Sequence, residues 1–424
     1  MPYIPREKNI IQIILRENYS DFEKIYDDVY AKDYGIYRLE RINETVEKFT
    51  VCGEWNQGIA RIKCTNSDCK HEYFRPFSCK QWYLCPSCHQ KRLLLLSEHL
   101  SQEVLLRLPH RQFVFTVPKL LRPYFKHNRK LFADVSKLIH KIITDYYNEC
   151  TGKKIITGSI ISYQSYGDMM RHNPHWHCII MEGGLTDNND FYHIPVKDIE
   201  SLTETFRKAV INLFVKKELF NKEFAEQVLS WKHSGFSVDN SIFLFPHDDN
   251  ARESLCQYIV RHPVSLRKIT YESTKKKVFY HTKYNEYWGE NVKLFKASDF
   301  IAELTQHIPP KHKHLIRYYG LYSSRTKGKA KQVGRYEKFG IKVNASDETA
   351  LTDTEDYKEV MDSKGSKRAW ARLIQKIYEI DPFICPLCES EMKIIAVIQD
   401  KSAIEKIISH LEKKRAPPEE MLVS

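Results

Sequence analysis

Six of the eleven cysteines lie between Cys52 and Cys88, and this cluster constrains the fold more than any other feature of the sequence. Four of the six form two close pairs, one with a four-residue and one with a two-residue spacer. Two such pairs can converge on one tetrahedral zinc ion and organise a segment that is too small for a large apolar core. We therefore predict a zinc-binding module over residues 51–92, with Zn²⁺ bound by Cys64, Cys69, Cys85 and Cys88.

The two remaining cysteines of this segment leave the ligand set open. Cys79 could replace one of the four, or it could share a second site with Cys52 and either His71 or His89. Four thiolates leave no open coordination position for chemistry, so this zinc is expected to have a structural role.

A further pair of cysteines, Cys385 and Cys388, lies close to the end of the chain. This pair has the two-residue spacer of a zinc ligand pair but no second pair near it in the sequence. His410 is a remote candidate partner, and whether Cys385 and Cys388 bind a metal stays open at this point.

The sequence shows no targeting or membrane-spanning segment. The first residues lack a basic stretch followed by an apolar run, and no stretch is long and apolar enough to span a bilayer. We expect a cytoplasmic protein without a membrane partner. Thiols stay reduced in the cytoplasm, which favours metal ligation by the cysteines over disulfides.

The positive charge of the chain is concentrated in one region. Lys and Arg exceed Asp and Glu by 66 to 54, and residues 261–340 alone hold 18 basic and 6 acidic side chains. This region alternates basic residues with tyrosines, which can stack on unpaired bases, whereas the alternative is a solvated basic face. We predict DNA binding there through Lys275, Lys276, Lys277, Arg317 and Arg325.

Two predicted strands carry a pair of histidines. The mixture of helical and strand patterns predicts an α+β fold, in which residues 158–164 and 175–181 form antiparallel neighbours. Side chains alternate along a strand, so His175 and His177 share one face while Trp176 points to the other. Such a pair can chelate one cation. The pairing could bring Gln164 beside the imidazoles as a third ligand, and His262 is the alternative.

A predicted helix over residues 251–261 carries a candidate nucleophile, Tyr258. A phenol can attack a metal-held phosphodiester, and a phosphotyrosine conserves the energy of the broken bond. Arg261 could neutralise the phosphate or form a structural salt bridge. A single tyrosine or a single pair of histidines is common by chance, so the residues alone do not decide the function.

The order of several short motifs resembles one known family, the rolling-circle transposases of the insertion sequence 91 family, which are HUH endonucleases. The motifs lie at residues 77–80, 85–88, 113–118, 173–177, 183–184, 257–265, 307–310, 317–320 and 385–388. The resemblance implies a nuclease domain with a ferredoxin-like antiparallel sheet. It also implies His175 and His177 as ligands of Mg²⁺ or Mn²⁺, Gln164 at a position where relatives carry His or Gln, and Tyr258 as nucleophile.

One position departs from many members of that family. They carry two tyrosines four residues apart on the catalytic helix, whereas this chain has Ser254 before Tyr258. The sequence therefore resembles the one-tyrosine branch that includes the common-region elements. This departure argues against a mechanism in which two tyrosines alternate between donor and target strands.

The resemblance and the composition together divide the chain. We expect an N-terminal helical segment over residues 1–50, the zinc-binding module over 51–92 and the nuclease domain over 93–270. A basic DNA-binding extension over 271–340, an acidic linker over 341–365 and a small C-terminal domain over 366–424 follow.

The expected activity is cleavage and rejoining of single DNA strands at element ends through a 5′-phosphotyrosine, with single-stranded element ends and target DNA as partners at the nucleoid. A plasmid rolling-circle initiator or relaxase is one alternative. A noncatalytic, zinc-dependent DNA-binding regulator is another. A homodimer, the recognised DNA sequence, the native catalytic metal and the activity of the element are left open.

Overall fold

An antiparallel sheet lies at the centre of the computed structural model, which describes residues 8–34, 38–261, 264–286, 289–326, 328, 339 and 384–413. Its strand order is β13-β4-β5-β3-β8, and β9 pairs with β3 beyond this path. The mixture of helices and antiparallel sheets confirms the predicted α+β class. The strands are β3 (His110–Thr116), β4 (Gly158–Tyr166), β5 (His172–Met181), β8 (Ser237–Asp239), β9 (Phe243–Leu244) and β13 (Ile316–Gly320).

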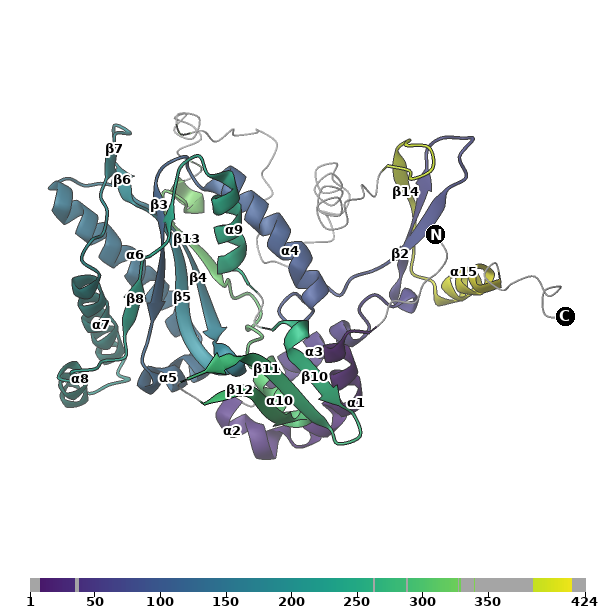
Figure 1. Ribbon diagram of the computed structural model, residues 1–424, viewed down its shortest axis with the longest axis horizontal. Helices are drawn as coiled ribbons and strands as arrows, with labels where there is room; N and C mark the ends of the chain where they lie inside the picture. Colours follow the sequence, from purple (N-terminus) through teal and green to yellow (C-terminus); the bar gives the residue numbers. More distant parts are fainter. Residues whose placement is uncertain are drawn as a thin grey trace.

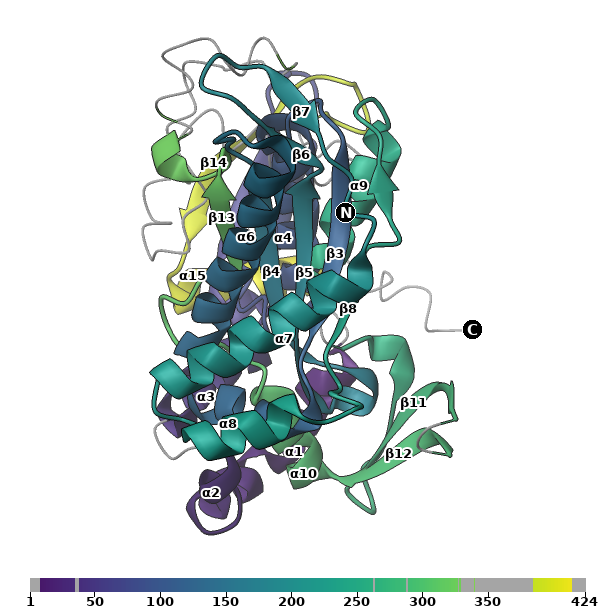
Figure 2. The same cartoon turned by 90° about the vertical axis from the view of Figure 1, so that its left-hand side faces the viewer.

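Helices cover one face of this sheet, and Figure 2 shows two of them, α6 and α7, in front of the strands. Inward-facing residues of the strands, among them Phe115, Trp176 and Cys178, share a buried cluster with Phe132 and Phe206 of these helices. The cluster explains why the strands alternate in hydrophobicity. The helices on this side are α5 (Arg122–His127), α6 (Lys130–Thr151), α7 (Ile199–Lys216) and α8 (Lys222–Leu229).

The opposite face is covered by α4 (Pro86–His99), which continues as a π-helix (Leu100–Val104), and by α9 (Asp249–Ile259). Ile160 and Ile179 of the sheet lie in one buried cluster with Leu255 and Ile259 of α9. The apolar residues of α9 recur every three to four positions, so one side of the helix faces the sheet. This packing fixes the position of α9 on the sheet.

A buried arginine ties α9 to the end of the preceding helical segment. The Arg252 side chain is fully buried and donates hydrogen bonds to the main-chain oxygens of Ser101, Leu105 and Leu106 at 3.2, 2.6 and 3.2 Å. These three carbonyl groups lie at or just after the π-helix, where no further helical N–H groups are available to donate to them. Arg252 therefore supplies the donors that the end of this helix lacks.

The N-terminal helices and the basic extension form one body. The α1, α3, β11 and α10 elements contribute Ile14, Phe49, Val278 and Phe300 to one buried cluster. Asn18 donates to the Tyr271 hydroxyl at 2.8 Å across the same contact. The elements are α1 (Ile10–Lys24), a π-helix (Tyr26–Tyr30), α2 (Ala31–Tyr34), α3 (Leu39–Thr50), β10 (Ile269–Glu272), β11 (Lys277–Asn285), β12 (Glu290–Lys296) and α10 (Ala297–Thr305).

A three-stranded sheet joins residues from the two ends of the chain. It has the order β14-β1-β2, with β1 (Ile59–Cys64), β2 (Glu72–Pro76) and β14 (Met392–Ile398). Ile404 of α15 (Lys401–Lys413) packs against Trp55 and Ile59 beside this sheet. Figure 1 shows the sheet and α15 to the right of the central sheet and apart from it.

Glycine is required where the central sheet gives way to the two-stranded sheet of β6 (Gly183–Leu185) and β7 (Phe191–His193). Gly183 has a φ of +130°, and a Cβ atom there would lie 1.9 Å from the carbonyl oxygen of Tyr192. Any other residue would therefore push β7 away from β6.

Helix α4 begins earlier than the pattern predicts. The apolar run indicates a helix from residue 93, but α4 begins at Pro86, because proline suits the first turn of a helix. The predicted linker over residues 341–365 and much of the predicted domain over 366–424 lie outside the described residues. Within the described residues, no helix is long and apolar enough to cross a membrane.

Replacing Arg252 tests the attachment of α9. We expect Arg252→Ala to lower the free energy of unfolding by at least about 3 kcal/mol, because three buried carbonyl groups lose a charged donor. Urea denaturation followed by circular dichroism measures this. Lys141→Ala is the control, since Lys141 forms an exposed pair with Asp145 within α6 and its loss should cost less than about 1 kcal/mol. Equal effects of the two substitutions would contradict the role of Arg252.

Candidate active site and thiolate clusters

The pairing of β4 with β5 brings polar side chains to one point on the sheet. Gln164 lies opposite His175, and Ser162 lies opposite His177. The Nε2 atoms of His175 and His177 are 3.1 Å apart. Trp176, between them, belongs to the cluster beneath α6, so the side chains alternate along this strand as the sequence predicts.

Neighbouring groups orient both imidazoles. The Nδ1 atom of His175 lies 2.8 Å from the main-chain oxygen of Asn173, which makes Nδ1 the protonated nitrogen and places the lone pair on Nε2. The Nδ1 atom of His177 lies 3.4 Å from the side-chain amide of Gln112 on β3. Each ring therefore has one nitrogen held by the protein and the other directed toward its partner ring.

Burial keeps both imidazoles neutral near pH 7. Desolvation lowers the pKa of His177 to about 3, and the nearby His175 contributes to this shift. Burial also lowers the pKa of His175, although the contact with the Asn173 carbonyl opposes that effect. Neutral imidazoles with free lone pairs are the form in which histidine binds metals.

Tyr258 stands beside this pair. Its ring centroid lies 5.1 Å from that of His177, with the two rings nearly perpendicular. The neighbouring Leu255 and Ile259 are buried against the sheet, whereas 45% of Tyr258 is exposed. The helix therefore holds Tyr258 next to the imidazoles and leaves its side chain accessible from solvent.

Two hydrogen bonds attach the end of α9 to β4. The Gln164 amide nitrogen donates to the main-chain oxygen of Ile259 at 3.3 Å, and the Tyr166 hydroxyl donates to the main-chain oxygen of Arg261. The Arg261 side chain is exposed. Across the described part of the chain, no carboxylate lies within ion-pair distance of it. His262 lies outside the described residues.

The structure thus brings together Gln164, His175, His177 and Tyr258, which sequence reasoning singled out. Sequence reasoning missed Gln112 and Tyr166. Gln112 lies on β3, and Tyr166 is the last residue of β4, two positions beyond the strand predicted at 158–164.

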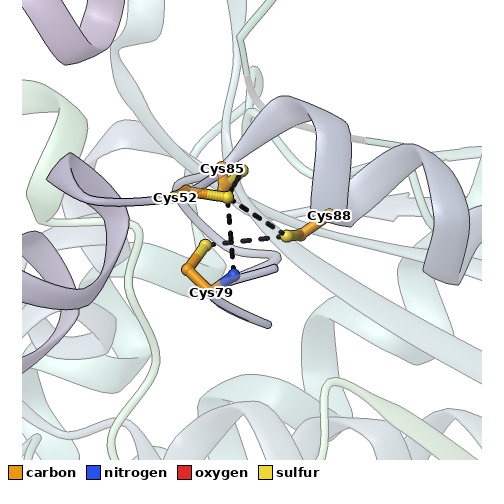
Figure 3. Close-up of side chains that lie close together, drawn as sticks. All are labelled: Cys52, Cys79, Cys85 and Cys88. Carbon is orange, nitrogen blue, oxygen red and sulfur yellow. Dashed lines mark hydrogen bonds between the residues drawn. The ribbon is translucent and has the colours of Figure 1, made fainter. Parts of the chain in front are cut away.

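Four cysteines near the start of α4 form one cluster, which Figure 3 shows in close-up. The Cys52 sulfur lies 3.8 Å from that of Cys85 and 4.0 Å from that of Cys88, and the Cys79 sulfur lies 3.6 Å from that of Cys88. All four Sγ atoms lie within 4.8 Å of one another. Sulfur atoms around a tetrahedral zinc ion lie about 3.8 Å apart, given a zinc–sulfur distance of about 2.3 Å.

The single site that we predict from Cys64, Cys69, Cys85 and Cys88 does not form. Cys64 and Cys69 cluster with Cys385 and Cys388 instead. The reason is geometric: Cys64 ends β1, and a strand of six residues carries the chain roughly 20 Å from its start. Cys52 precedes that strand and Cys79 follows β2, so both remain near Cys85 and Cys88. Neither His71 nor His89 joins a cluster among the described residues.

The predicted DNA-binding residues lie on two separate elements. Lys275, Lys276 and Lys277 are exposed at the turn from β10 to β11, where Lys275 pairs with Glu272 and Lys276 with Asp21. Arg317 lies half-buried on the edge strand β13, and Arg325 is exposed beyond that strand. The structure therefore groups the three lysines at one turn and places the two arginines on β13 and in the segment that follows it.

Comparisons with known proteins match both the cysteine-rich N-terminal part of the chain and the part that contains the paired imidazoles. Residues 158–330 match the family model described as "Putative transposase", and residues 21–117 match the model of a transposase zinc-binding domain. The chain is 24% identical, over 84% of its own length and 83% of the relative's, to the transposase for insertion sequence element IS801 from Pseudomonas savastanoi pv. phaseolicola. No solved structure matches the chain.

These matches define the class of protein: the chain is a transposase. The match to the IS91-type zinc-binding domain and the relative that covers most of the chain identify the particular group. The chain belongs to the insertion sequence 91 family of transposases. The zinc-binding domain and the cysteine clusters together support Zn²⁺ as a cofactor.

Removing one thiol from the cluster of Figure 3 tests its role. We expect Cys79→Ser to lose about one equivalent of zinc, because three thiolates and a hydroxyl bind zinc poorly. Metal analysis of the purified protein measures the loss. Cys150→Ser is the control, since Cys150 is exposed and lies in neither cluster. An unchanged zinc content in Cys79→Ser would exclude this cluster as a zinc site.

Proposed function

We propose that this transposase cleaves and rejoins single DNA strands at element ends, with Tyr258 as the nucleophile and a 5′-phosphotyrosine as the intermediate of rolling-circle transposition. The observation that carries the proposal is the position of an accessible tyrosine ring 5.1 Å from His177 of the paired imidazoles. The matched transposase domain favours this activity over a plasmid initiator or relaxase.

The reaction that we propose exchanges one phosphoester bond for another and needs no oxidant, reductant or nucleotide. The Tyr258 oxygen forms a bond to phosphorus, the bond from phosphorus to the 3′ oxygen breaks, and the 3′ oxygen leaves as a hydroxyl with the proton that tyrosine gives up. The 5′ end stays attached to Tyr258, which conserves the energy of the broken bond. A later attack by a 3′ hydroxyl reverses the step and joins the strand to a new partner.

The donor set at the imidazole pair fits a divalent cation. Two ligands of an octahedral Mg²⁺ or Mn²⁺ ion at about 2.1 Å and at a right angle lie about 3.0 Å apart, which matches the 3.1 Å between the Nε2 atoms of His175 and His177. Gln164 would add its amide oxygen, because its nitrogen is engaged with Ile259. A bound cation would polarise the scissile phosphate.

Gln112 supports the same assignment. Its side-chain oxygen is buried without a hydrogen-bond partner in the described structure, and its amide faces Nδ1 of His177. Turning the amide by 180° lets that oxygen accept a hydrogen bond from Nδ1–H and leaves Nε2 free for the cation. Gln112 would then act as a positioning residue for His177.

One tyrosine serves this mechanism. The position one turn before Tyr258 on α9 is Ser254, so the helix has no second tyrosine at that position. We propose that Tyr258 acts on both strands in succession. Arg261, exposed at the end of α9, would neutralise the phosphate that Tyr258 attacks.

The basic elements offer two contact areas for DNA. The ion pairs of Lys275 and Lys276 are exposed and therefore weak, so phosphate groups can replace the carboxylates. Lys277 continues this area, and Tyr284 on β11, which is 66% exposed, offers a ring for base stacking. Arg317 and Arg325 would hold a second stretch of the strand. Action on element ends would bring the protein to the nucleoid.

Removing the phenol oxygen tests the nucleophile. We expect Tyr258→Phe to form no covalent adduct with a single-stranded element-end oligonucleotide in the presence of Mg²⁺ or Mn²⁺, while its mobility shift with the same DNA persists. A denaturing gel with labelled DNA measures the adduct. Tyr192→Phe is the control, since Tyr192 on β7 contacts Lys153 and lies outside the site. An adduct in Tyr258→Phe would refute the proposal, and DNA binding by the wild type without an adduct would favour a noncatalytic regulator.

Removing one imidazole tests the cation. We expect His177→Ala to slow adduct formation roughly 100-fold or more, because a metal ion contributes several kcal/mol to the transition state. DNA binding should persist, since the lysines at the β10–β11 turn are untouched. Single-turnover cleavage over a series of Mn²⁺ concentrations measures the rate. His99→Ala, which removes a half-buried imidazole on α4 that pairs with Glu103, is the control. Equal rates in His177→Ala and the wild type would exclude a catalytic role.

A further inference from the structure

The second thiolate cluster joins residues from opposite ends of the chain. The Cys64 sulfur lies 3.5 Å from that of Cys388, and the Cys69 sulfur lies 3.6 Å from that of Cys385. All four Sγ atoms lie within 4.8 Å of one another. The two measured separations are close to the roughly 3.8 Å expected between thiolates on one tetrahedral zinc ion.

The main chain around these cysteines is organised as two facing turns. Cys64 and Cys69 flank the turn between β1 and β2, where the Cys64 amide donates to the His71 carbonyl at 3.0 Å. Cys385 and Cys388 lie in the turn before β14, where the Cys385 amide donates to the Ser390 carbonyl at 2.8 Å. Thr65 bridges the turns, because its amide donates to the Glu391 carbonyl at 2.9 Å.

A strained backbone position recurs in both clusters. Glu389 follows Cys388 with a φ of +58°, and Lys80 follows Cys79 with a φ of +56°. A left-handed conformation costs a residue other than glycine about 1 kcal/mol or more, so the surroundings must impose it. The turn after Cys388 therefore has the same backbone conformation as the turn after Cys79, which lies in the matched zinc-binding domain.

Apolar packing around the second cluster is small. Apart from the four cysteines, its core holds Ile62 and Met392, with Tyr73 packed against them. On β14, Ile395 and Val397 are exposed. Even together with the second small cluster, in which Trp55 and Ile59 contact Ile404, this core stabilises a three-stranded sheet only weakly, and small domains of this kind usually depend on a metal or a disulfide.

We propose that Cys64, Cys69, Cys385 and Cys388 bind a second zinc ion, which holds β14 against β1. The match to the zinc-binding domain ends at residue 117, so two of these ligands lie outside it. With this ion in place, the zinc-binding part of the protein comprises residues from both ends of the chain. Four thiolates complete the tetrahedron, so the ion is structural and independent of the chemistry at Tyr258.

Metal analysis of the full-length protein tests the proposal. The wild type should hold about two equivalents of zinc, and Cys388→Ser and Cys79→Ser should each hold about one. The double variant should hold none, and Cys150→Ser should hold two. Cys388→His, which restores a zinc ligand, should regain the second equivalent if the site binds metal.

Limited proteolysis supplies the structural readout. Trypsin should release the C-terminal segment that contains β14 faster from Cys388→Ser than from Cys79→Ser, because only the former loses the link to β1. Two equivalents of zinc in Cys388→Ser, or one in the wild type together with a disulfide among these four cysteines in mass spectra of the unreduced protein, would overturn the proposal.

Discussion

The antiparallel register of β4 and β5 is the constraint from which the candidate active site follows. A slip of one residue would turn every side chain of β5 to the other face. Trp176 prevents such a slip, because it is fully buried, packs within 6 Å of the rings of Phe125 and Phe132, and donates its indole N–H to the Phe132 carbonyl at 3.2 Å. Hydrophobic burial on one face therefore directs the two imidazoles on the other.

The position of Tyr258 follows from the same sheet. Leu255 and Ile259 bury one side of α9 against the strands, and Arg252 fastens its first turns to the segment after α4. Gln164 connects the two parts of the site, since it lies opposite His175 and donates to the main chain of Ile259. The nucleophile and the ligand pair that we propose are therefore held by packed elements, which is what positioning a phosphodiester for attack would require.

Local sequence patterns predicted the strands and the helix of the candidate active site. The grouping of the cysteines and the packing of the N-terminal helices depend on nonlocal contacts, which such patterns do not predict. The alternation of side chains predicts strands at 158–164 and 175–181, and the observed strands are Gly158–Tyr166 and His172–Met181. The capping pattern predicts a helix whose ends lie within two residues of the observed Asp249–Ile259. The grouping of the cysteines was wrong, because Cys64 meets Cys388 across 324 positions and no local spacing encodes that contact. The packing of α1 on β10 and α10, through Asn18 and Tyr271, was missed for the same reason.

The cysteine clusters and the proposed imidazole site differ in ligand chemistry, and this difference would give them different metal preferences. Thiolates are soft ligands that select zinc, and four of them leave no open position. The ligands that we propose at His175, His177 and Gln164 would leave several coordination positions open, which phosphate oxygens could occupy. Four thiolates would also bind zinc more tightly than two imidazoles would. Scarce zinc would therefore fill the thiolates first and leave the imidazole pair to a more abundant, weakly bound ion, so that one chain can keep its structural metals while the ion at its reactive site exchanges.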